Sequence, residues 1–295
     1  GVILLGTRLM GLTVLEAAVL GAVLAAVSPA VVVPRMVRLM EEGYGKREGI
    51  PQMILAGASV DDVYVIVLFS TFTGMMQGKG VSAVSFINIP VSILLGIILG
   101  LAAGSLLALF FKQVHIRDTS KVLILLSISL FLVAAEDMLT TPISFSSLIA
   151  VMFIGIGLQK KRGEAARRIS VKYGKLWVAA EIFLCVLVGA AVNTGYLAQA
   201  GGRALLVILG ALAFRMAGVA LCLWGTKLGR RERLFVMLAY TPKATVQAAI
   251  GGIPLSMGFA YGDTVLTAAV LAIVLTAPLG AFAMDLSYQK LLNRS

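Results

Sequence analysis

Two adjacent aspartates, Asp61 and Asp62, lie in the middle of an apolar segment that runs from about Met53 to Phe72. A segment of this length can cross a bilayer as one helix. Each charged carboxylate at the centre of such a helix costs roughly 3 kcal/mol to insert. A water-filled cavity, a nearby cation or protonation lowers that cost, so the pair indicates a protein that handles protons or cations within the membrane. The simpler alternative is that the aspartates only pair with neighbouring helices.

The composition is that of a membrane protein with several spanning helices. Of the 295 residues 59% are hydrophobic and only 13% are charged, whereas a soluble domain carries about 25% charged residues. The mean hydropathy is +0.98. The only cysteines, Cys185 and Cys222, both lie in apolar segments, so we expect neither a disulfide nor a metal site from them. No nucleotide-binding loop or catalytic constellation is found, and we expect no cofactor and no enzymatic activity.

Long apolar runs predict an all-α protein with about nine transmembrane helices. The predicted spans are Leu12–Met40, Gln52–Met76, Val84–Phe111, Lys121–Met138, Ser146–Leu158, Leu176–Val192, Ala204–Leu228, Leu234–Ile253 and Thr264–Met284. Most lysines and arginines lie in the connections after the first, third, fifth and seventh spans and in the C-terminal tail. The positive-inside rule therefore predicts a cytoplasmic C-terminus. The net charge of +11 then faces the lipid bilayer's cytoplasmic leaflet, and nucleic acid is not an expected partner.

Two of the predicted helices are interrupted by proline. The first contains Pro29 and Pro34, and the second contains Thr241, Pro242 and Lys243. Proline removes a backbone donor and clashes with the preceding turn. Interrupted helices at membrane depth are typical of transporters, where they line a binding site.

The two interrupted helices enter from opposite sides, which predicts an inverted repeat in which the discontinuous helices cross. Each is followed by an unbroken helix. Half-helix ends that meet at such a crossing carry partial charges that need compensation. Lys243 is placed to compensate the C-terminal ends, although direct ion chemistry is the alternative for this residue.

Three motifs together resemble one family. They are Ala26-Val27-Ser28-Pro29-Ala30-Val31-Val32-Val33-Pro34, Ala58-Ser59-Val60-Asp61-Asp62, and Pro242-Lys243-Ala244-Thr245-Val246-Gln247-Ala248-Ala249. In order and spacing they are similar to those of the monovalent cation/proton antiporter superfamily, specifically the NHA-type sodium/proton exchangers. The resemblance runs from about Gly11 to the C-terminus. The family has further helices before its first broken one, so we expect the sequence to be N-terminally incomplete.

The resemblance implies roles for individual residues. The family's ion-binding carboxylate falls on Asp62, its adjacent partner on Asp61, and the basic residue before the second crossing on Arg215. Asp62 is thereby expected to bind Na⁺ or Li⁺ in competition with H⁺. Arg215 or Lys243 is expected to neutralise Asp61, and in relatives the arginine often pairs with an acidic residue on an earlier helix, outside this sequence.

This sequence departs from the family at two positions. Many relatives have an aspartate where this chain has Ser28, and some have a glutamate where it has Gly57. The cation is therefore expected to be held by fewer charges, with Ser28, Ser59 and backbone carbonyls completing its coordination shell.

The resemblance implies antiport of Na⁺ or Li⁺ against H⁺ by alternating access, and with it a role in pH homeostasis. The expected divisions are the first part of the ion-transporting core at 1–80, a linker helix at 81–112, a scaffold and homodimer contact at 113–195, and the second part of the core at 196–295. A bacterial or archaeal cytoplasmic membrane is the expected location. The main alternative is another inverted-repeat transporter, such as an organic-anion/sodium symporter.

Overall fold

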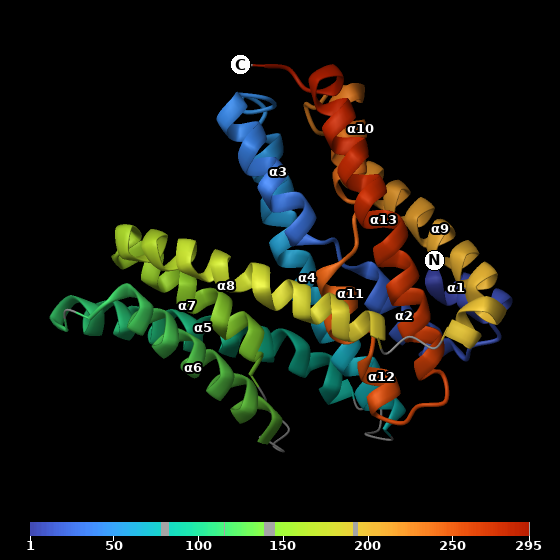
Figure 1. The fold of residues 1–295 in the computed structure, drawn as a ribbon, viewed down its shortest axis with the longest axis horizontal. Helices are drawn as coiled ribbons and strands as arrows, with labels where there is room; N and C mark the ends of the chain where they lie inside the picture. Colours follow the sequence, from blue (N-terminus) through green and yellow to red (C-terminus); the bar gives the residue numbers. More distant parts are fainter. Residues whose placement is uncertain (78–82, 115, 139–144, 191–193, 295) are drawn as a thin grey trace. The chain divides into compact units, whose positions relative to one another are not determined.

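The computed structural model describes residues 1–77, 83–114, 116–138, 145–190 and 194–294, and it is helical throughout these ranges apart from loops and one isolated bridge between Tyr44 and Arg294. The helices appear in Figure 1. Their bounds are α1 (Val2–Leu9), α2 (Val14–Ala25), α3 (Pro29–Glu42), α4 (Ile50–Met76), α5 (Ala83–Gln113), α6 (Asp118–Met138), α7 (Ser147–Lys161), α8 (Gly163–Ala190), α9 (Thr194–Cys222), α10 (Arg230–Ala239), α11 (Thr245–Ile250), α12 (Ile253–Ser256) and α13 (Gly262–Leu291).

Six helical segments are long and apolar enough to cross a membrane within the described ranges. They are Val14–Glu42, Ile50–Met76, Pro90–Gln113, Asp118–Glu136, Gly201–Cys222 and Gly262–Leu291. The prediction of an all-helical membrane protein is therefore confirmed, while the count of nine spans stays a prediction. Short α1 precedes the first predicted span and packs against α2 and α9.

The helices form two compact units, one made of residues 1–79 with 184–295 and the other of residues 80–183. The first unit holds α1–α4 and α9–α13, and the second holds α5–α7 with most of α8. The assignment of these parts to an ion-transporting core, a linker and a dimer scaffold stays a prediction.

The first interruption, between α2 and α3, comprises residues 26–28. A capping box of Thr13 and Glu16 starts α2. Proline disfavours helical geometry in the residue before it, and Ser28 accordingly adopts an extended conformation with φ −85° and ψ 110°. Pro29 then occupies the first helical position of α3, where its missing N–H costs nothing.

The prediction that Pro34 breaks the helix is wrong, because Pro34 lies inside α3. At this position the proline removes only one backbone hydrogen bond from a helix that has just begun. The remaining bonds of α3 continue to Glu42, where Gly43 ends the helix with φ 82°.

The second interruption comprises residues 240–244 and separates α10 from α11. It includes Thr241, Pro242 and Lys243, as the sequence predicts. The backbone N–H of Ser28 donates to the carbonyl of Pro242 at 2.8 Å, so the two interruptions meet. The helices that follow, α4 and α13, are continuous over 27 and 30 residues.

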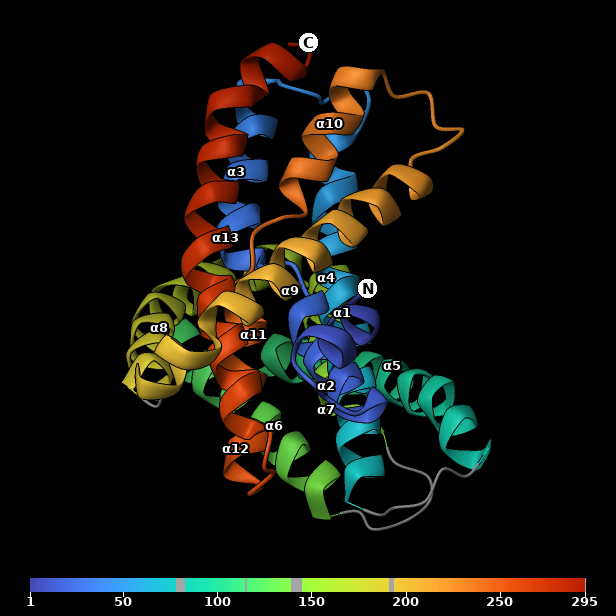
Figure 2. The same ribbon diagram turned by 90° about the vertical axis from the view of Figure 1, so that its right-hand side faces the viewer.

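Two clusters of buried apolar side chains fill the first unit. One cluster gathers buried side chains of α2, α9 and the N-terminal half of α13, among them Leu20 and Ile208. The other gathers α3, α4, α10 and the C-terminal half of α13, among them Met36 and Phe235. Figure 2 shows α3, α10 and α13 at the end of the unit where the C-terminus lies. Both interruptions lie where the clusters meet, because Ala26 and Val246 belong to the first cluster and Val27 and Ala239 to the second.

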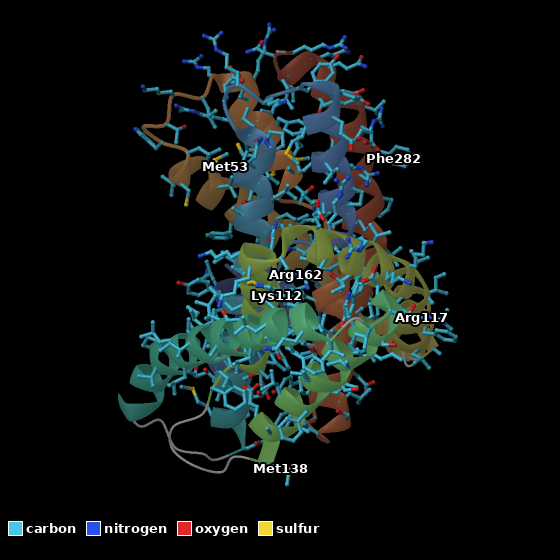
Figure 3. The ribbon with its side chains drawn as sticks, turned by 90° about the vertical axis from the view of Figure 1, so that its left-hand side faces the viewer. Met53, Lys112, Arg117, Met138, Arg162 and Phe282 are labelled. Atoms are coloured by element: carbon cyan, nitrogen blue, oxygen red, sulfur yellow. The ribbon has the colours of Figure 1, made fainter. Side chains whose placement is uncertain are left out.

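The second unit is built on a close contact between α5 and α7. Glycines at 96, 100 and 104 recur every four residues and place one face of α5 against the backbone of α7, so that a Cβ at Gly96 would lie 2.7 Å from the carbonyl oxygen of Ser146. Small residues at this spacing allow membrane helices to approach closely. At the end of this contact Arg162 donates to the carbonyl of Phe111 at 2.6 Å; Lys112 and Arg162 are labelled in Figure 3.

Candidate functional site

Asp61 is held by two donors from different elements. Its Oδ2 accepts a hydrogen bond from the backbone N–H of Val27 at 2.9 Å and from Nη2 of Arg215 at 2.7 Å. The side chains of Asp61 and Arg215 are only 23% and 18% exposed. α4 and α9 are thereby joined to the first interruption by one charged pair.

Arg215 makes further contacts with two other elements. Its Nη1 donates to the carbonyl of Ala25, the last residue of α2. Its guanidinium lies over the ring of Tyr240, 5.7 Å from the ring centroid. Arginine keeps its proton in proteins, so Asp61 has a permanent cationic partner. The sequence left Arg215 and Lys243 open as partners of Asp61, and the structure places Arg215 there.

Asp62 is in a different situation from its neighbour. Its Oδ1 is buried and has no hydrogen-bond partner in the described part of the chain. The hydroxyl of Ser28, at the first interruption, is likewise fully buried and without a partner. A buried oxygen without a partner is costly unless a proton, water or cation satisfies it. Both groups have the chemistry of hard-cation ligands.

Lys243 and Gln247 satisfy the end of α2. Both side chains are almost completely buried, with exposed fractions of 1% and 0%. Nζ of Lys243 donates to the carbonyl of Ala26 at 3.2 Å, and Nε2 of Gln247 donates to the carbonyls of Val23 and Ala26, each at 3.0 Å. These are carbonyls that a helix C-terminus leaves unpaired, and a cation there opposes the negative end of the helix dipole. The role of Lys243 in dipole compensation stays a prediction.

The remaining predicted residues lie as follows. Thr241 donates to the carbonyl of Leu238 at 2.8 Å, and Pro242 accepts from Ser28, so both belong to the meeting point of the interruptions. The side chain of Ser59 lies outside the described residues. Its proposed part in the coordination shell stays a prediction.

Three residues of the site were not assigned from the sequence. Gln247 stands within the motif that begins at Pro242, but its contacts with α2 are separated by more than 220 residues along the chain. Thr276 accepts from the backbone N–H of Lys243 at 2.9 Å. Tyr240 packs on Arg215. No local pattern signals such contacts, because each joins elements far apart in sequence.

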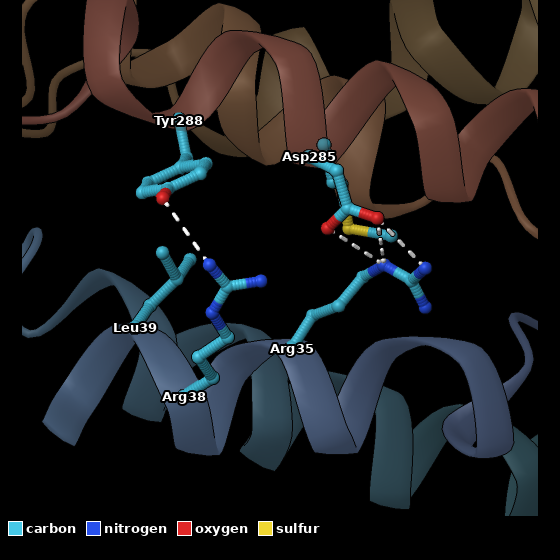
Figure 4. A pocket seen from close by; sticks show the side chains of 6 residues that line it. Arg35, Arg38, Leu39, Asp285 and Tyr288 are labelled. Atoms are coloured by element: carbon cyan, nitrogen blue, oxygen red, sulfur yellow. Dashed lines mark hydrogen bonds and ion pairs between the residues drawn. The ribbon is translucent and has the colours of Figure 1, made fainter. Parts of the chain in front are cut away.

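A second polar cluster joins α3 to α13 away from these residues. Arg35 pairs with Asp285 through both Nε and Nη2, at 2.9–3.2 Å, and Nη2 of Arg38 donates to the hydroxyl of Tyr288 at 3.5 Å. Figure 4 shows both contacts. The Arg35 and Asp285 side chains are 28% and 41% exposed, so this pair contributes less than a buried one. It is a contact that fixes α3 on α13.

Comparison with known proteins identifies relatives over nearly the whole chain. The profile of the family described as "Sodium/hydrogen exchanger, transmembrane" matches residues 1–284. Sodium/hydrogen exchanger 9B2 of Xenopus tropicalis is 33% identical, over 97% of this chain and 55% of the relative. For Homo sapiens, exchanger 9B2 is 31% identical over 99% and 56%, and exchanger 9B1 is 30% identical over 93% and 55%. The chain thus spans about half the length of the curated relatives it matches.

A solved structure shows the same fold. The sodium proton antiporter MjNhaP1 from Methanocaldococcus jannaschii at pH 8 superposes with a TM-score of 0.83, covering 98% of this chain and 76% of that chain at 21% identity. The expected antiporter fold is therefore confirmed. The exchangers from Xenopus tropicalis and Homo sapiens are vertebrate proteins, and they give no support to the expected bacterial or archaeal membrane.

Proposed function

Because the chain belongs to the sodium/hydrogen exchanger family, we propose that it exchanges Na⁺ or Li⁺ for H⁺ across a membrane, with Asp62 as the carboxylate that cation and proton share. It is an integral membrane protein with the fold of an antiporter. The chain covers only part of the length of its curated relatives. The transport activity of the whole protein is therefore itself part of the proposal.

The observation that carries the proposal is the unpartnered, buried oxygen of Asp62 beside Asp61, whose Oδ2 accepts from Arg215 and Val27. A proton satisfies that oxygen in one state of the carboxylate and a dehydrated cation satisfies it in the other. The hydroxyl of Ser28 is available as a second, neutral ligand. Because one carboxylate receives either ion, loading with one requires release of the other.

Asp61 has a different role in this proposal. Its carboxylate already accepts from Arg215 and from the backbone of Val27. Since arginine does not release its proton at accessible pH, the pair does not supply a second transported proton. One cation is then exchanged for one proton at Asp62.

Lys243 and Arg215 keep the site assembled in the absence of a transported ion. They donate to the carbonyls of Ala26 and Ala25 at the end of α2. The charges they bring offset the negative end of that helix, so that the interruption persists without a bound cation.

The remaining features of the proposal concern the whole protein. The first unit moves relative to a scaffold that also forms a homodimer contact, and the C-terminus lies in the cytoplasm, as the distribution of basic residues indicates. Monovalent cations, protons and the lipid bilayer are its partners, and no cofactor takes part.

Everted vesicles that contain the full-length chain test the proposal. After a proton gradient is formed, addition of Na⁺ or Li⁺ should dissipate it, as followed by acridine-orange fluorescence, while an organic acid should not. Asp62→Asn should abolish the response at unchanged protein abundance. Asp285→Asn is the matched control, because Asp285 lies in the α3–α13 contact and not at the interruptions. An active Asp62→Asn variant refutes the role of Asp62, and a response to organic acids alone favours the symporter alternative.

A further inference from the structure

Tyr240, the first residue of the second interruption, contacts two other elements at once. Its ring lies under the guanidinium of Arg215 on α9, and its hydroxyl lies against Gly57 on α4. The side chain is partly buried. No role follows for it from the charge arrangement described above.

The hydroxyl of Tyr240 occupies the space that a side chain at position 57 would need. A Cβ added to Gly57 would collide with the hydroxyl oxygen and would lie 3.1 Å from Cζ. The backbone does not require glycine there, because Gly57 is helical and is absent from the glycines with positive φ. Glycine within a helix costs about 1 kcal/mol relative to alanine, so space for the tyrosine is the feature that glycine provides.

Gly57 and Asp61 lie on the same face of α4, since they are four residues apart. The tyrosine hydroxyl therefore sits one turn away from the carboxylate that pairs with Arg215. Gly57 lies against the hydroxyl of Tyr240 and the guanidinium of Arg215 lies over its ring, so that Tyr240 packs between α4 and Arg215. A cation over an aromatic ring is attracted to its face, more strongly where water is excluded.

We propose that Tyr240 is a positioning residue that holds Arg215 on Asp61 and so keeps Asp62 free for the transported cation, and that Gly57 is required to seat its hydroxyl. This inference rests on the proposed function. Without the ring, the guanidinium can turn toward Asp62, one residue along α4, and compete there with Na⁺. The KM for Na⁺ then rises more than the maximal rate falls.

The aromatic face and the hydroxyl have separable effects. Tyr240→Phe keeps the ring beneath Arg215, and its KM for Na⁺ should stay within about twofold of wild type. Tyr240→Leu removes the ring, and its KM should rise about 3- to 30-fold, as expected for a lost cation–π contact. Tyr64→Leu is the matched control, since Tyr64 lies on α4 with 58% of its surface exposed.

The pairing with Gly57 is tested by a double-mutant cycle. Gly57→Ala should raise the KM about as much as Tyr240→Leu, because the new methyl group displaces the ring. Adding Tyr240→Phe to Gly57→Ala removes the colliding hydroxyl and should restore the KM to within about threefold of wild type. Gly74→Ala is the control, because a Cβ at Gly74 on the same helix meets nothing within 4 Å.

The experiment measures KM and maximal rate for Na⁺ in everted vesicles with the full-length chain, together with the midpoint of thermal unfolding (Tm) of the purified variants. A KM for Tyr240→Leu equal to that of Tyr64→Leu, or a double variant as impaired as Gly57→Ala, overturns the proposal. A wild-type protein without Na⁺-driven proton movement refutes the proposed function instead. In that case the Tm values still test the contact between Gly57 and Tyr240. Gly57→Ala should lower Tm more than Gly74→Ala, and adding Tyr240→Phe to Gly57→Ala should restore Tm. A Tm that is not restored overturns the proposed contact.

Discussion

Replacing Asp61 by asparagine isolates the contribution of its charge, because the side chain keeps its size. Oδ2 of Asp61 lies 2.7 Å from Nη2 of Arg215 and 2.9 Å from the backbone nitrogen of Val27. In Asp61→Asn these hydrogen bonds can persist, but the negative charge is lost. Arg215 is then a cation that is 82% buried and has no other carboxylate in the described ion pairs.

The expected loss of stability follows from the burial of the pair. Two unit charges about 4 Å apart interact by about 4 kcal/mol at an effective dielectric constant of about 20. Removing one partner of a buried pair costs about 3–5 kcal/mol. Since about a fifth of each side chain is exposed, we expect the lower end, about 3 kcal/mol. At 2–4 °C per kcal/mol for a chain of this size, Tm should fall by about 6–12 °C.

The assay is thermal unfolding of purified protein in detergent, followed by intrinsic fluorescence, for Asp61→Asn, Arg215→Gln and the double variant. The double variant leaves no unpaired charge, so its loss should be smaller than the sum of the single losses by about 2–3 kcal/mol. A fall of less than 2 °C for Asp61→Asn, or strictly additive losses, would refute the reasoning that this pair is buried and coupled.

Five further substitutions are followed by the same measurement: three at close contacts, and Gly155→Ala and Asp285→Asn as their counterparts. Lys243→Met removes the Nζ donor to the carbonyl of Ala26, to which Gln247 also donates, and should lower Tm by about 2–8 °C, since a cation at a buried helix C-terminus contributes about 1–2 kcal/mol; an unchanged Tm contradicts this. Gly280→Ala should lower Tm comparably, because its methyl group would lie 2.5 Å from the proline ring of the second interruption. Gly100→Ala should lower Tm, because a Cβ at position 100 would collide with the backbone of α7, whereas Gly155→Ala should not, because a Cβ at position 155 meets nothing within 4 Å. Equal effects would contradict the close α5–α7 contact. Asp285→Asn should change Tm by less than about 3 °C, because its partner contact is substantially exposed.

The local features of the fold were predictable from the sequence because their causes are local. Proline constrains its own backbone and that of the preceding residue, and both interruptions occur where Pro29 and Pro242 predict them. Pro34 shows the limit of this reasoning. A proline near the start of a helix removes one bond and leaves the helix intact, so the residue type alone does not decide between a break and a continuous helix.

The ion pair between Asp61 and Arg215 could not be predicted from the sequence, because it depends on tertiary contacts. Asp61 and Arg215 are 154 residues apart, and the pattern of charges allowed Arg215 or Lys243 as the partner of Asp61. The structure pairs Asp61 with Arg215, one of the two partners that the sequence left open. The contact of Tyr240 with Gly57 has no sequence signal, since a glycine in a membrane helix has many possible causes.

The central claim is that a cation and a proton share the carboxylate of Asp62. It is tested most directly by adding Na⁺ or Li⁺ to the purified full-length protein in weakly buffered detergent solution and measuring the protons released with a pH indicator. Wild type and Asp285→Asn should release about one proton for each cation bound, and Asp62→Asn should release none. Equal proton release from wild type and Asp62→Asn would contradict the account.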